Sequence, residues 1–314
     1  MKKYENSDKR DILIEVALLK YKMDLSQIEI AKRLNISTMQ VSRLLEKARQ
    51  SGIIKIEVDT GVSTDSVLEA KIKEQYDLKS VIVVKTSKAS DPIDDLARAA
   101  AMYIDLIVVP DSVFGIAGGK TIMRIIPHLK LPLIKHDNDI EVVQLTGGLL
   151  STTVGNPLIS LHEFTSRFNA RGYFLNTPIY VPQAMVSNYL DTGNFAKINE
   201  LWNRCTVCLG SVGAVGKDFL FYEEGSISAE QMEEVERKGA VGNVFGRWLD
   251  EKGDYIDCEL NNMVISIPPD ILKTIPNRIF VSGSYERIKA AKAILQKKIY
   301  NVCVITDTMA ADLV

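Results

Sequence analysis

The chain has 314 residues, of which 46% are hydrophobic and 25% charged, values typical of a soluble globular protein large enough for more than one domain. No stretch approaches the ~20 apolar residues of a membrane helix. The charged start MKKYENSDKR also lacks the apolar core of a signal peptide, so we expect a cytoplasmic protein.

The net charge of −2 does not by itself indicate nucleic-acid binding, but its distribution is uneven. Residues 1–60 hold 12 Lys and Arg against 9 Asp and Glu, a net of +3, which leaves −5 on residues 61–314. A mildly basic N-terminal segment, the head, followed by an acidic remainder, the body, is compatible with a DNA-binding protein whose larger part has another function.

The first 58 residues predict three helices and a short strand. Ile12, Val16 and Leu19 lie on the apolar face of a helix within 10–21. Ser26 and Glu29 form a capping box that starts a second helix at Gln27. Its predicted buried stripe is Ile28, Ile30, Ala31 and Leu34.

Asn35 breaks that helix, because Asn tolerates a left-handed backbone, and Ser37 caps a third helix that runs to about Ser51. The third helix is expected to bury Val41, Leu44, Leu45 and Ala48. Gly52 ends it, and the alternation over 54–58 predicts a wing-like strand carrying Ile54, Ile56 and Val58.

Helix, tight turn and helix in this order predict a (winged) helix-turn-helix domain whose second helix enters the DNA major groove. Gln and Arg can make bidentate contacts to adenine and guanine, whereas Lys47 and Arg49 lie where phosphates are expected. The alternative is an ordinary helical hairpin with a solvated basic face. The candidate DNA-contacting residues are Ser37, Thr38, Gln40, Ser42, Arg43 and Lys47.

The polar segment DTGVSTD marks a linker over 59–65, which separates a DNA-binding domain, 1–58, from a second domain, 66–314. In the second domain helical and strand patterns alternate, and several strands are short continuous apolar runs, as in a sheet covered on both faces. We therefore predict a doubly wound α/β domain with a mostly parallel sheet. Strands are expected at 80–85, 112–117, 141–145, 205–209, 264–267, 278–281 and 302–305, and helices at 66–76, 93–106, 121–129, 156–168, 229–238, 285–297 and 308–313.

Three predicted strands end in glycine turns: GGKT at 118–121, TGG at 146–148 and GSVG at 210–213. The first turn offers the backbone N–H groups of its two glycines, the ammonium of Lys120 and the hydroxyl of Thr121. These hydrogen-bond donors could bind an anion and are best suited to phosphate. This turn is not a P-loop, since Phe114 stands where that motif needs Gly, and no GxGxxG fingerprint is present. Each turn alone is more often a simple connection, but three at the carboxyl ends of one sheet favour a shared ligand site.

Four cysteines are expected to be free thiols in a reducing compartment. Cys205 and Cys208 have the CxxC spacing, but on a strand they point to opposite faces. With no second CxxC, we expect neither a metal site nor a cofactor.

The chain resembles the SorC family of bacterial transcriptional regulators. In the head the resemblance is carried by Ser26-Gln27, Ile30-Ala31, Leu34, Ile36-Ser37, VSRLL at 41–45, Ala48-Arg49 and Gly52-Ile53. In the body it is carried by GIAGGKT at 115–121, VVQLTGG at 142–148, Asn156-Pro157, LGSVG at 209–213, GAVG at 239–242, Phe245-Gly246, VSG at 281–283 and VITD at 304–307.

This resemblance implies an effector domain with the fold of sugar-phosphate isomerases and deaminases, which binds a phosphorylated sugar at the glycine turns. It implies a phosphate held by Gly118, Gly119, Lys120 and Thr121, and a hydroxyl held by Gln144. The further effector-binding candidates are Gly147, Gly148, Asn243 and Arg287.

Four positions depart from the family pattern. Thr38 stands where an Arg often follows the capping Ser, so the operator cannot be copied from relatives. Asn243 replaces a common acidic residue, and Arg287 replaces a Lys but can still grip phosphate as a planar fork. Thr146 replaces the Lys that some members have, and because it cannot form a Schiff base we expect non-covalent binding.

The leading hypothesis is a regulator of a carbohydrate operon, not an enzyme, whose affinity for double-stranded operator DNA is allosterically controlled by a phosphorylated sugar. Palindromic operators require a homodimer, and the resemblance implies a tetramer. One alternative is a sugar-phosphate isomerase, deaminase or aldolase with a docking head, although the glycine turns hold no carboxylate or histidine and Asp307 is the nearest strand-end acid. Another is a ligand-independent architectural protein.

Overall fold

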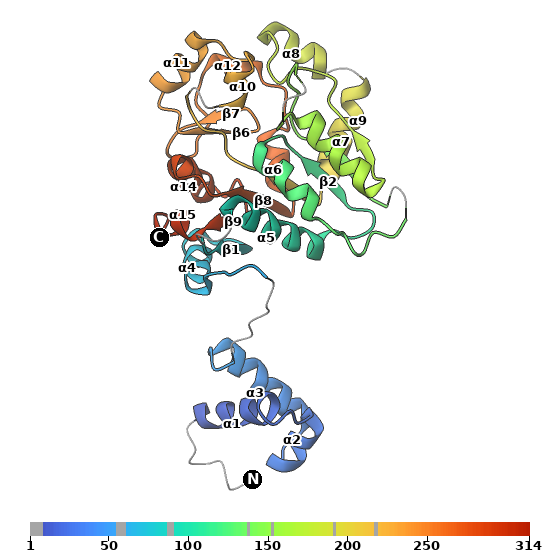
Figure 1. Cartoon of the computed structure of the whole chain (residues 1–314), viewed down its shortest axis with the longest axis vertical. Coiled ribbons are helices and arrows are strands. Elements are labelled where there is room, and N and C mark those ends of the chain that lie inside the picture. The colour runs from blue at the N-terminus through green and yellow to red at the C-terminus, as the bar shows by residue number, and fades with distance from the viewer. Residues whose placement is uncertain are drawn as a thin grey trace. The chain divides into compact units, whose positions relative to one another are not determined.

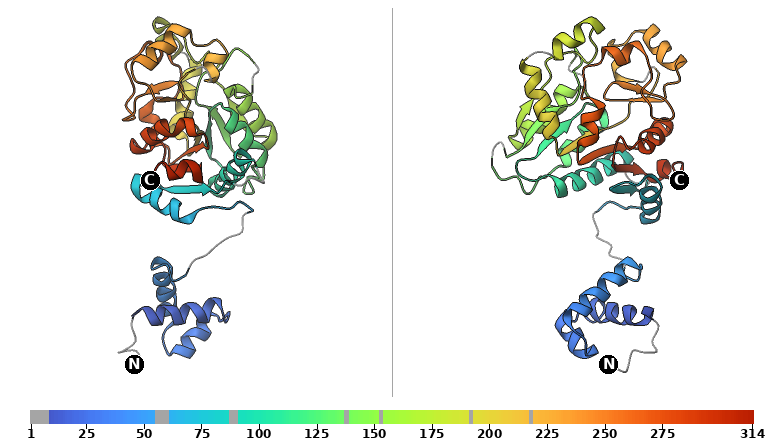
Figure 2. Two further views of the ribbon diagram at one scale, coloured as in Figure 1. Left: turned by 60° about the vertical axis from the view of Figure 1, so that its left-hand side comes forward. Right: turned by 180° about the vertical axis from the view of Figure 1, so that it is seen from behind.

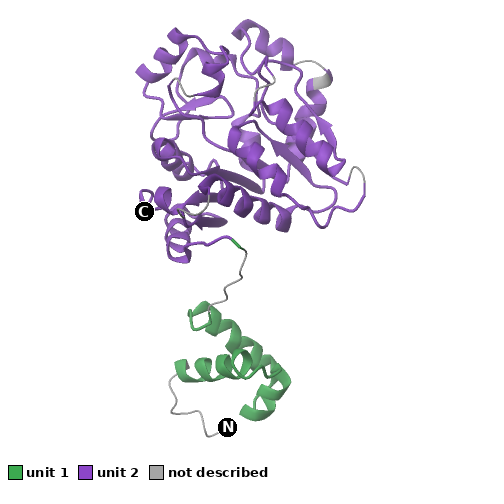
Figure 3. Ribbon diagram, viewed as in Figure 1, with its two compact units in different colours: residues 1–61 green, residues 62–314 purple. Residues whose placement is uncertain are grey.

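In the computed structural model of the chain, two compact units are separated near residue 61, namely Met1–Gly61 and Val62–Val314 (Figures 1 and 3). The structure describes residues 9–54, 61–86, 91–136, 139–151, 154–190, 193–216 and 219–314.

The first unit contains three helices, α1 (Lys9–Tyr21), α2 (Gln27–Leu34) and α3 (Thr38–Gln50). Both predicted caps are formed. The Ser26 Oγ accepts from the Glu29 N–H at 3.3 Å, and the Ser26 N–H donates to the Glu29 carboxylate at 2.8 Å. Asn35 has a φ of 54°, the left-handed conformation that ends α2 and lets the chain turn into α3.

A small apolar core holds these helices together, with Val16 of α1, Ile30 of α2, and Val41 and Leu45 of α3 at its centre. The prediction that Ile28 is buried is wrong: its side chain is 60% exposed, because it lies on the outer side of α2. Helix α3 and the turn after it end as predicted near Gly52. The predicted wing strand lies outside the described residues from 55 onward.

The second unit is built on a sheet of seven strands in the order β1-β9-β8-β5-β2-β3-β4, and every neighbouring pair is parallel. The doubly wound, mostly parallel sheet is therefore confirmed. The strands are β1 (Ser80–Val84), β2 (Val113–Ile116), β3 (Glu141–Gln144), β4 (Arg171–Tyr173), β5 (Val207–Gly210), β8 (Asn277–Ser282) and β9 (Val302–Thr306).

Helices cover both faces of this sheet. Helices α5, α6 and α7 lie over one face, and α9 and α13 are seen over the other when the molecule is viewed from behind (Figures 1 and 2). The helices are α4 (Ser66–Tyr76), α5 (Pro92–Ile107), α6 (Lys120–Ile125), α7 (Pro157–Phe168), α8 (Gln183–Leu190), α9 (Gly193–Arg204), α10 (Leu220–Glu223), α11 (Ala229–Arg237), α12 (Glu259–Met263), α13 (Pro269–Thr274), α14 (Ile288–Gln296) and α15 (Asp307–Ala311).

A second, smaller core lies around an antiparallel hairpin, β6 (Gly242–Val244) and β7 (Arg247–Leu249). Trp248 of β7 is fully buried there, with its ring edge-on to Phe219 at a centroid distance of 5.1 Å. A bridge between Gly213 and Asn243 joins this hairpin to the segment after β5. The smaller core is therefore tied to the carboxyl end of the sheet.

Several predicted elements are shorter or different in the structure. The predicted strand at 264–267 is wrong, because this segment makes only isolated bridges, from Val264 to Tyr180 and from Ser266 to Thr146. The predicted helix at 121–129 is α6 followed by a 3-10 turn, Ile126–His128, which contains Pro127. A 3-10 turn, Tyr285–Arg287, likewise precedes α14.

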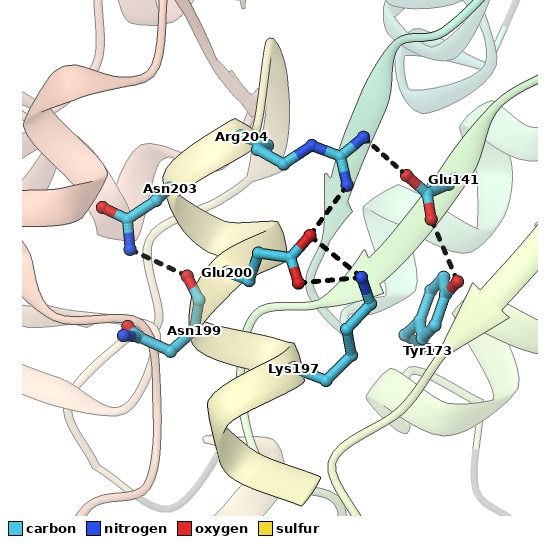
Figure 4. A network of polar contacts seen from close by, with 7 residues as sticks. All are labelled: Glu141, Tyr173, Lys197, Asn199, Glu200, Asn203 and Arg204. Carbon is cyan, nitrogen blue, oxygen red and sulfur yellow. Dashed lines mark hydrogen bonds and ion pairs between the residues drawn. The ribbon is translucent and has the colours of Figure 1, made fainter. Parts of the chain in front are cut away.

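Polar contacts fasten α9 to the edge of the sheet formed by β3 and β4 (Figure 4). Arg204 reaches the Glu141 carboxylate at 2.9 Å and the Glu200 carboxylate at 3.2 Å, and the Tyr173 hydroxyl donates to Glu141 at 3.0 Å. The Arg204 and Glu200 side chains are 47% and 50% exposed and the Glu141 side chain 21%, so each ion pair contributes at most about 1 kcal/mol. The network orients α9 more than it stabilises the unit.

Candidate functional site

A cavity of about 150 Å³ opens where the strand order of the sheet reverses. The chain moves from β2 outward through β3 to β4, then returns to place β5 on the other side of β2 and continues through β8 to β9. Ligands of open α/β sheets bind at the carboxyl ends of the strands at such a point. The lining residues are Ala117, Gly118, Gly119, Lys120, Thr121, Thr146, Gly155, Ser211, Val212, Gly213, Ala214, Phe219, Leu220, Phe221, Asn243, Phe245, Gly246 and Arg287.

The first glycine turn contributes all four of its predicted residues, Gly118 to Thr121, to this lining. Gly119 has a φ of 137°, which residues with a Cβ rarely adopt, and it precedes α6 with no side-chain cap. The first N–H groups of α6 have no acceptors within the helix. Donors are thus open to the cavity on this side.

The third glycine turn lines the same cavity through residues 211–214. A Cβ on Gly213 would lie 2.3 Å from the Asn243 Nδ2, so only glycine allows this close approach. The backbones of Gly213 and Asn243 also exchange hydrogen bonds of 2.8 and 3.1 Å. The turn therefore fixes the position of Asn243 at the cavity wall.

The second glycine turn contributes Thr146 but neither of its glycines. Gln144, Gly147 and Gly148 are not among the residues that line the cavity, and their contact with an effector stays a prediction. The Gln144 side chain is fully buried; its Nε2 donates to the Thr146 carbonyl at 2.6 Å and its Oε1 accepts from the Leu175 N–H at 3.1 Å. Each end of the amide makes a hydrogen bond within the protein, so Gln144 supports the end of β3.

Asn243 is 3% exposed, and its Nδ2 has no hydrogen-bond partner among the described residues. A buried polar group without a partner costs about 1–3 kcal/mol, so such groups normally face something that completes them. Asn243 lines the cavity, where a bound ligand would supply that partner.

Arg287 comes from the 3-10 turn after β8 and lines the same cavity. Burial lowers the pKa of its guanidinium from the ordinary value, and no ion pair holds this group in the described part of the chain. Lys120 is more exposed, and its Nζ lies 3.8 Å from the Glu223 carboxylate on α10. An unpaired, partly desolvated cation beside a second cation favours an anionic ligand.

No Asp, Glu or His is among the described residues that line the cavity. Asp307 follows β9, where its carboxylate accepts from the Thr86 hydroxyl at 2.8 Å and from the Thr308 N–H. The polar groups available to a ligand in this cavity are therefore Arg, Lys, Asn, Thr and Ser side chains and backbone groups.

The four cysteines are buried and free. Burial raises the pKa of the Cys208 thiol to about 12, so this thiol is protonated and a poor metal ligand. The described residues hold no cluster of three or more His, Cys, Asp or Glu side chains that could bind a metal ion. Among those residues, no helix has the length and apolar character needed to cross a membrane.

On the first unit, the early residues of α3 present a polar face to solvent. Thr38, Ser42, Arg43 and Lys47 are exposed. Gln40 is exposed as well, but its Oε1 accepts from the Ser37 N–H at 2.9 Å and its N–H donates to the Ser37 hydroxyl at 3.2 Å. Gln40 and Ser37 therefore cap the helix, so Gln40 must leave this pairing to contact a base with both amide atoms.

The sequence reasoning missed the aromatic wall of the cavity. Phe219, Leu220 and Phe221 belong to the segment that forms α10, and Phe245 follows β6. No motif marks 219–221. The one available signal was the aromatic pair flanking Leu220 in an otherwise acidic stretch.

The second unit matches a known protein family. Residues 61–314 match the family of sugar-binding domains, so the chain belongs to that family. It is similar over 98% of its length to the deoxyribonucleoside regulator of Bacillus subtilis (28% identity, 98% of that protein) and to the sorbitol operon regulator of Klebsiella pneumoniae (20% identity, 99% of that protein).

Among solved structures, the full-length sorbitol operon regulator SorC from Klebsiella pneumoniae aligns with a TM-score of 0.72 at 19% identity, covering 98% of this chain and 99% of that one. A DeoR family regulator from Listeria monocytogenes also aligns with a TM-score of 0.72, at 24% identity, over 79% of this chain and 98% of that one. These structures share the fold. The chain is a SorC-family transcriptional regulator, and its relatives are regulators rather than enzymes.

Proposed function

We propose that the protein is a sequence-specific DNA-binding regulator of a carbohydrate operon, whose operator affinity changes when a phosphorylated sugar binds non-covalently in the second unit. In this proposal residues 1–58 read DNA, 59–65 form the linker and 66–314 sense the effector. The observation that carries it is the cavity at the strand-order switch, where, among the described residues, the Arg287 guanidinium forms no ion pair and the Asn243 Nδ2 has no hydrogen-bond partner.

The phosphate is assigned to the first glycine turn and the cations beside it. Lys120 and Arg287 supply charge, and Thr121 and the backbone N–H groups of the turn supply directional donors. Asn243 is assigned to an oxygen of the sugar, since its amide is buried at the wall formed with the third turn. Thr146 lines the cavity where a Lys would be needed for a Schiff base, so binding is non-covalent.

The DNA-reading surface is assigned to the exposed face of α3. Thr38, Ser42 and Arg43 are placed for the major groove and Lys47 for the backbone, in the manner of other helix-turn-helix proteins. The relatives named above are regulators of sorbitol and deoxyribonucleoside functions, which supports a carbohydrate operon as the target. Pairs of heads on a palindromic operator require at least a homodimer.

A two-part binding assay tests the proposal. A thermal-shift screen of phosphorylated sugars and their unphosphorylated forms should show stabilisation only by the phosphorylated compounds. Titration of operator DNA with and without the stabilising compound should then change the Kd by about 5- to 150-fold, the range of ordinary allosteric coupling. Unchanged operator affinity at saturating effector would refute the coupling, and stabilisation by unphosphorylated sugars would refute the phosphate site.

A further inference from the structure

Met39 carries the most exposed large hydrophobic side chain in the described part of the first unit, at 64%. It lies in the first turn of α3, two residues after the capping Ser37. A single exposed apolar side chain is ordinary on a protein surface and has no meaning by itself. Its place on the helix, and the groups around it, give Met39 a specific use.

Helical geometry directs Met39 away from the core of the first unit. The buried residues of α3 are Val41, Leu45 and Ala48. At the 3.6 residues per turn of a helix, Met39 and Arg43 project within about 30° of the direction opposite to these residues. Thr38 and Ser42 are exposed too, but they project to one side of that direction. Met39 and Arg43 therefore occupy the centre of the outward face in the first two turns.

The polar residues near this centre differ in how free they are to bind a base. Gln40, of the residue type that reads adenine, is engaged in the helix cap, where its Oε1 accepts from the Ser37 N–H at 2.9 Å. Arg43 is exposed and makes no ion pair within the described residues. The centre of the outward face thus presents one cation and one thioether.

An apolar side chain in the major groove meets one apolar group, the C5-methyl of thymine. The other bases present hydrogen-bonding groups there, which a thioether covers without replacing their hydrogen bonds to water. Methionine is unbranched and has three rotatable bonds, so it adapts its shape to a neighbouring methyl group. A methionine that α3 carries into the groove therefore favours thymine over the other bases.

We infer that Met39 is a specificity-determining residue, which contacts the methyl group of one thymine in each operator half-site. The inference rests on the proposed reading of DNA by α3, and adds to it a residue outside the predicted DNA-contacting set. Four helical residues advance by about 6 Å, close to two base pairs at about 3.4 Å each. The thymine should therefore lie within about two base pairs of a guanine bound by Arg43.

Uracil substitution tests the contact, because uracil pairs as thymine does but lacks the methyl group. The DNA is the duplex that the full-length wild-type protein selects from random-sequence oligonucleotides, and each thymine is replaced singly by uracil. At one thymine per half-site the wild-type Kd should rise about 3- to 10-fold, as expected when one methyl group and its contact lose their burial. Met39→Ala, an exposed change that leaves the core intact, should bind both duplexes equally at that position.

Thr38→Ser and Met23→Ala are the matched controls. The first removes only a methyl group from the neighbouring residue of α3, and the second removes a methionine side chain that is 54% exposed outside α3. Both should keep the full preference for thymine over uracil.

Two results would overturn the inference while the proposed function stands. One is a selected duplex in which no thymine methyl affects the wild-type Kd. The other is a preference for thymine that Met39→Ala retains or that Thr38→Ser abolishes. Selection of no sequence at all would instead refute the proposed reading of DNA, and this inference with it.

Discussion

At the scale of single residues, Arg287 is the cavity residue from which the proposed function makes the sharpest prediction. Its guanidinium lines the cavity without an ion pair in the described residues, and burial lowers its pKa. A partly buried cation without a partner destabilises the fold and is tolerated where binding requires it. Replacing Arg287 is therefore expected to affect the stability of the empty protein and its affinity for the effector in opposite directions.

Arg287→Met should leave the Tm of the empty protein unchanged or slightly raised, because it removes a desolvated charge. The same change should lower the affinity for a phosphorylated sugar at least tenfold, since charge-assisted hydrogen bonds to phosphate are lost. Thermal shift with and without the compound measures both. Arg287→Lys is the control and should retain part of the affinity; a large drop in the empty protein's Tm would contradict this account.

Glu223 is the second residue whose effect follows from its position. Its carboxylate lies 3.8 Å from the Lys120 Nζ, and both side chains are partly exposed. Glu223→Gln should increase affinity for the phosphorylated effector by about 2- to 5-fold, since a solvent-exposed competing ion pair contributes at most about 1 kcal/mol. Glu233→Gln on α11 is the matched control and should have no effect on titrations of the same compound.

At the scale of elements, the connections matter more than the strands. The sheet is assembled from short buried runs, but the turns after β2 and β5 bring together groups that line the cavity. In the head, the paired caps Ser26–Glu29 and Ser37–Gln40 set the starts of α2 and α3, and the left-handed Asn35 sets the angle between them.

Ser37→Ala should destabilise the head by about 1 kcal/mol, because it removes the side-chain acceptor for the Gln40 N–H at the start of α3. Denaturant unfolding of the full chain, followed by hydrogen exchange of amides in α3, measures this loss locally. Ser42→Ala, an exposed change within α3, should be nearly neutral for stability. Equal exchange in the two variants would show that the cap does not stabilise α3.

Gly119→Ala should impair the effector site without unfolding the sheet. The φ of 137° at this position strains any residue with a Cβ, even though the space around it is open. The first turn must shift to relieve the strain, which displaces donors at the cavity. We expect the thermal shift by phosphorylated sugars to fall severalfold, while far-UV circular dichroism stays unchanged. Gly52→Ala, at a glycine of positive φ in the first unit, is the control.

At the scale of the whole molecule, the chain forms two compact units, and the proposed function gives each unit its own task. Arg43→Ala should abolish specific operator binding and leave effector affinity intact, because Arg43 is exposed on α3 and belongs to the first unit. Lys120→Ala should weaken effector binding and leave operator affinity in the absence of effector intact. Gel-shift and thermal-shift titrations of both variants test the division, and loss of both activities in either variant would contradict it.

The sequence by itself determined the local features: where most helices and strands lie, which residues cap them, and the family to which the chain belongs. These depend on residues a few positions apart, such as Ser26 with Glu29 or the apolar run of β2, and local chemistry decides them. The prediction of a strand at 264–267 was wrong because an apolar run does not show whether a neighbouring strand is available to pair with it.

Only the tertiary structure decided which glycine turns share a cavity. The order of strands brings β5 beside β2, although about 90 residues separate them in the chain, and Gly213 and Asn243 therefore line the same cavity as Lys120. The same packing turns Gln144 inward, where Leu175 and Thr146 take up both ends of its amide, while Thr146 two positions later faces the ligand space. The reason is physical: strand order and side-chain environment are set by contacts between distant segments, which no local pattern encodes.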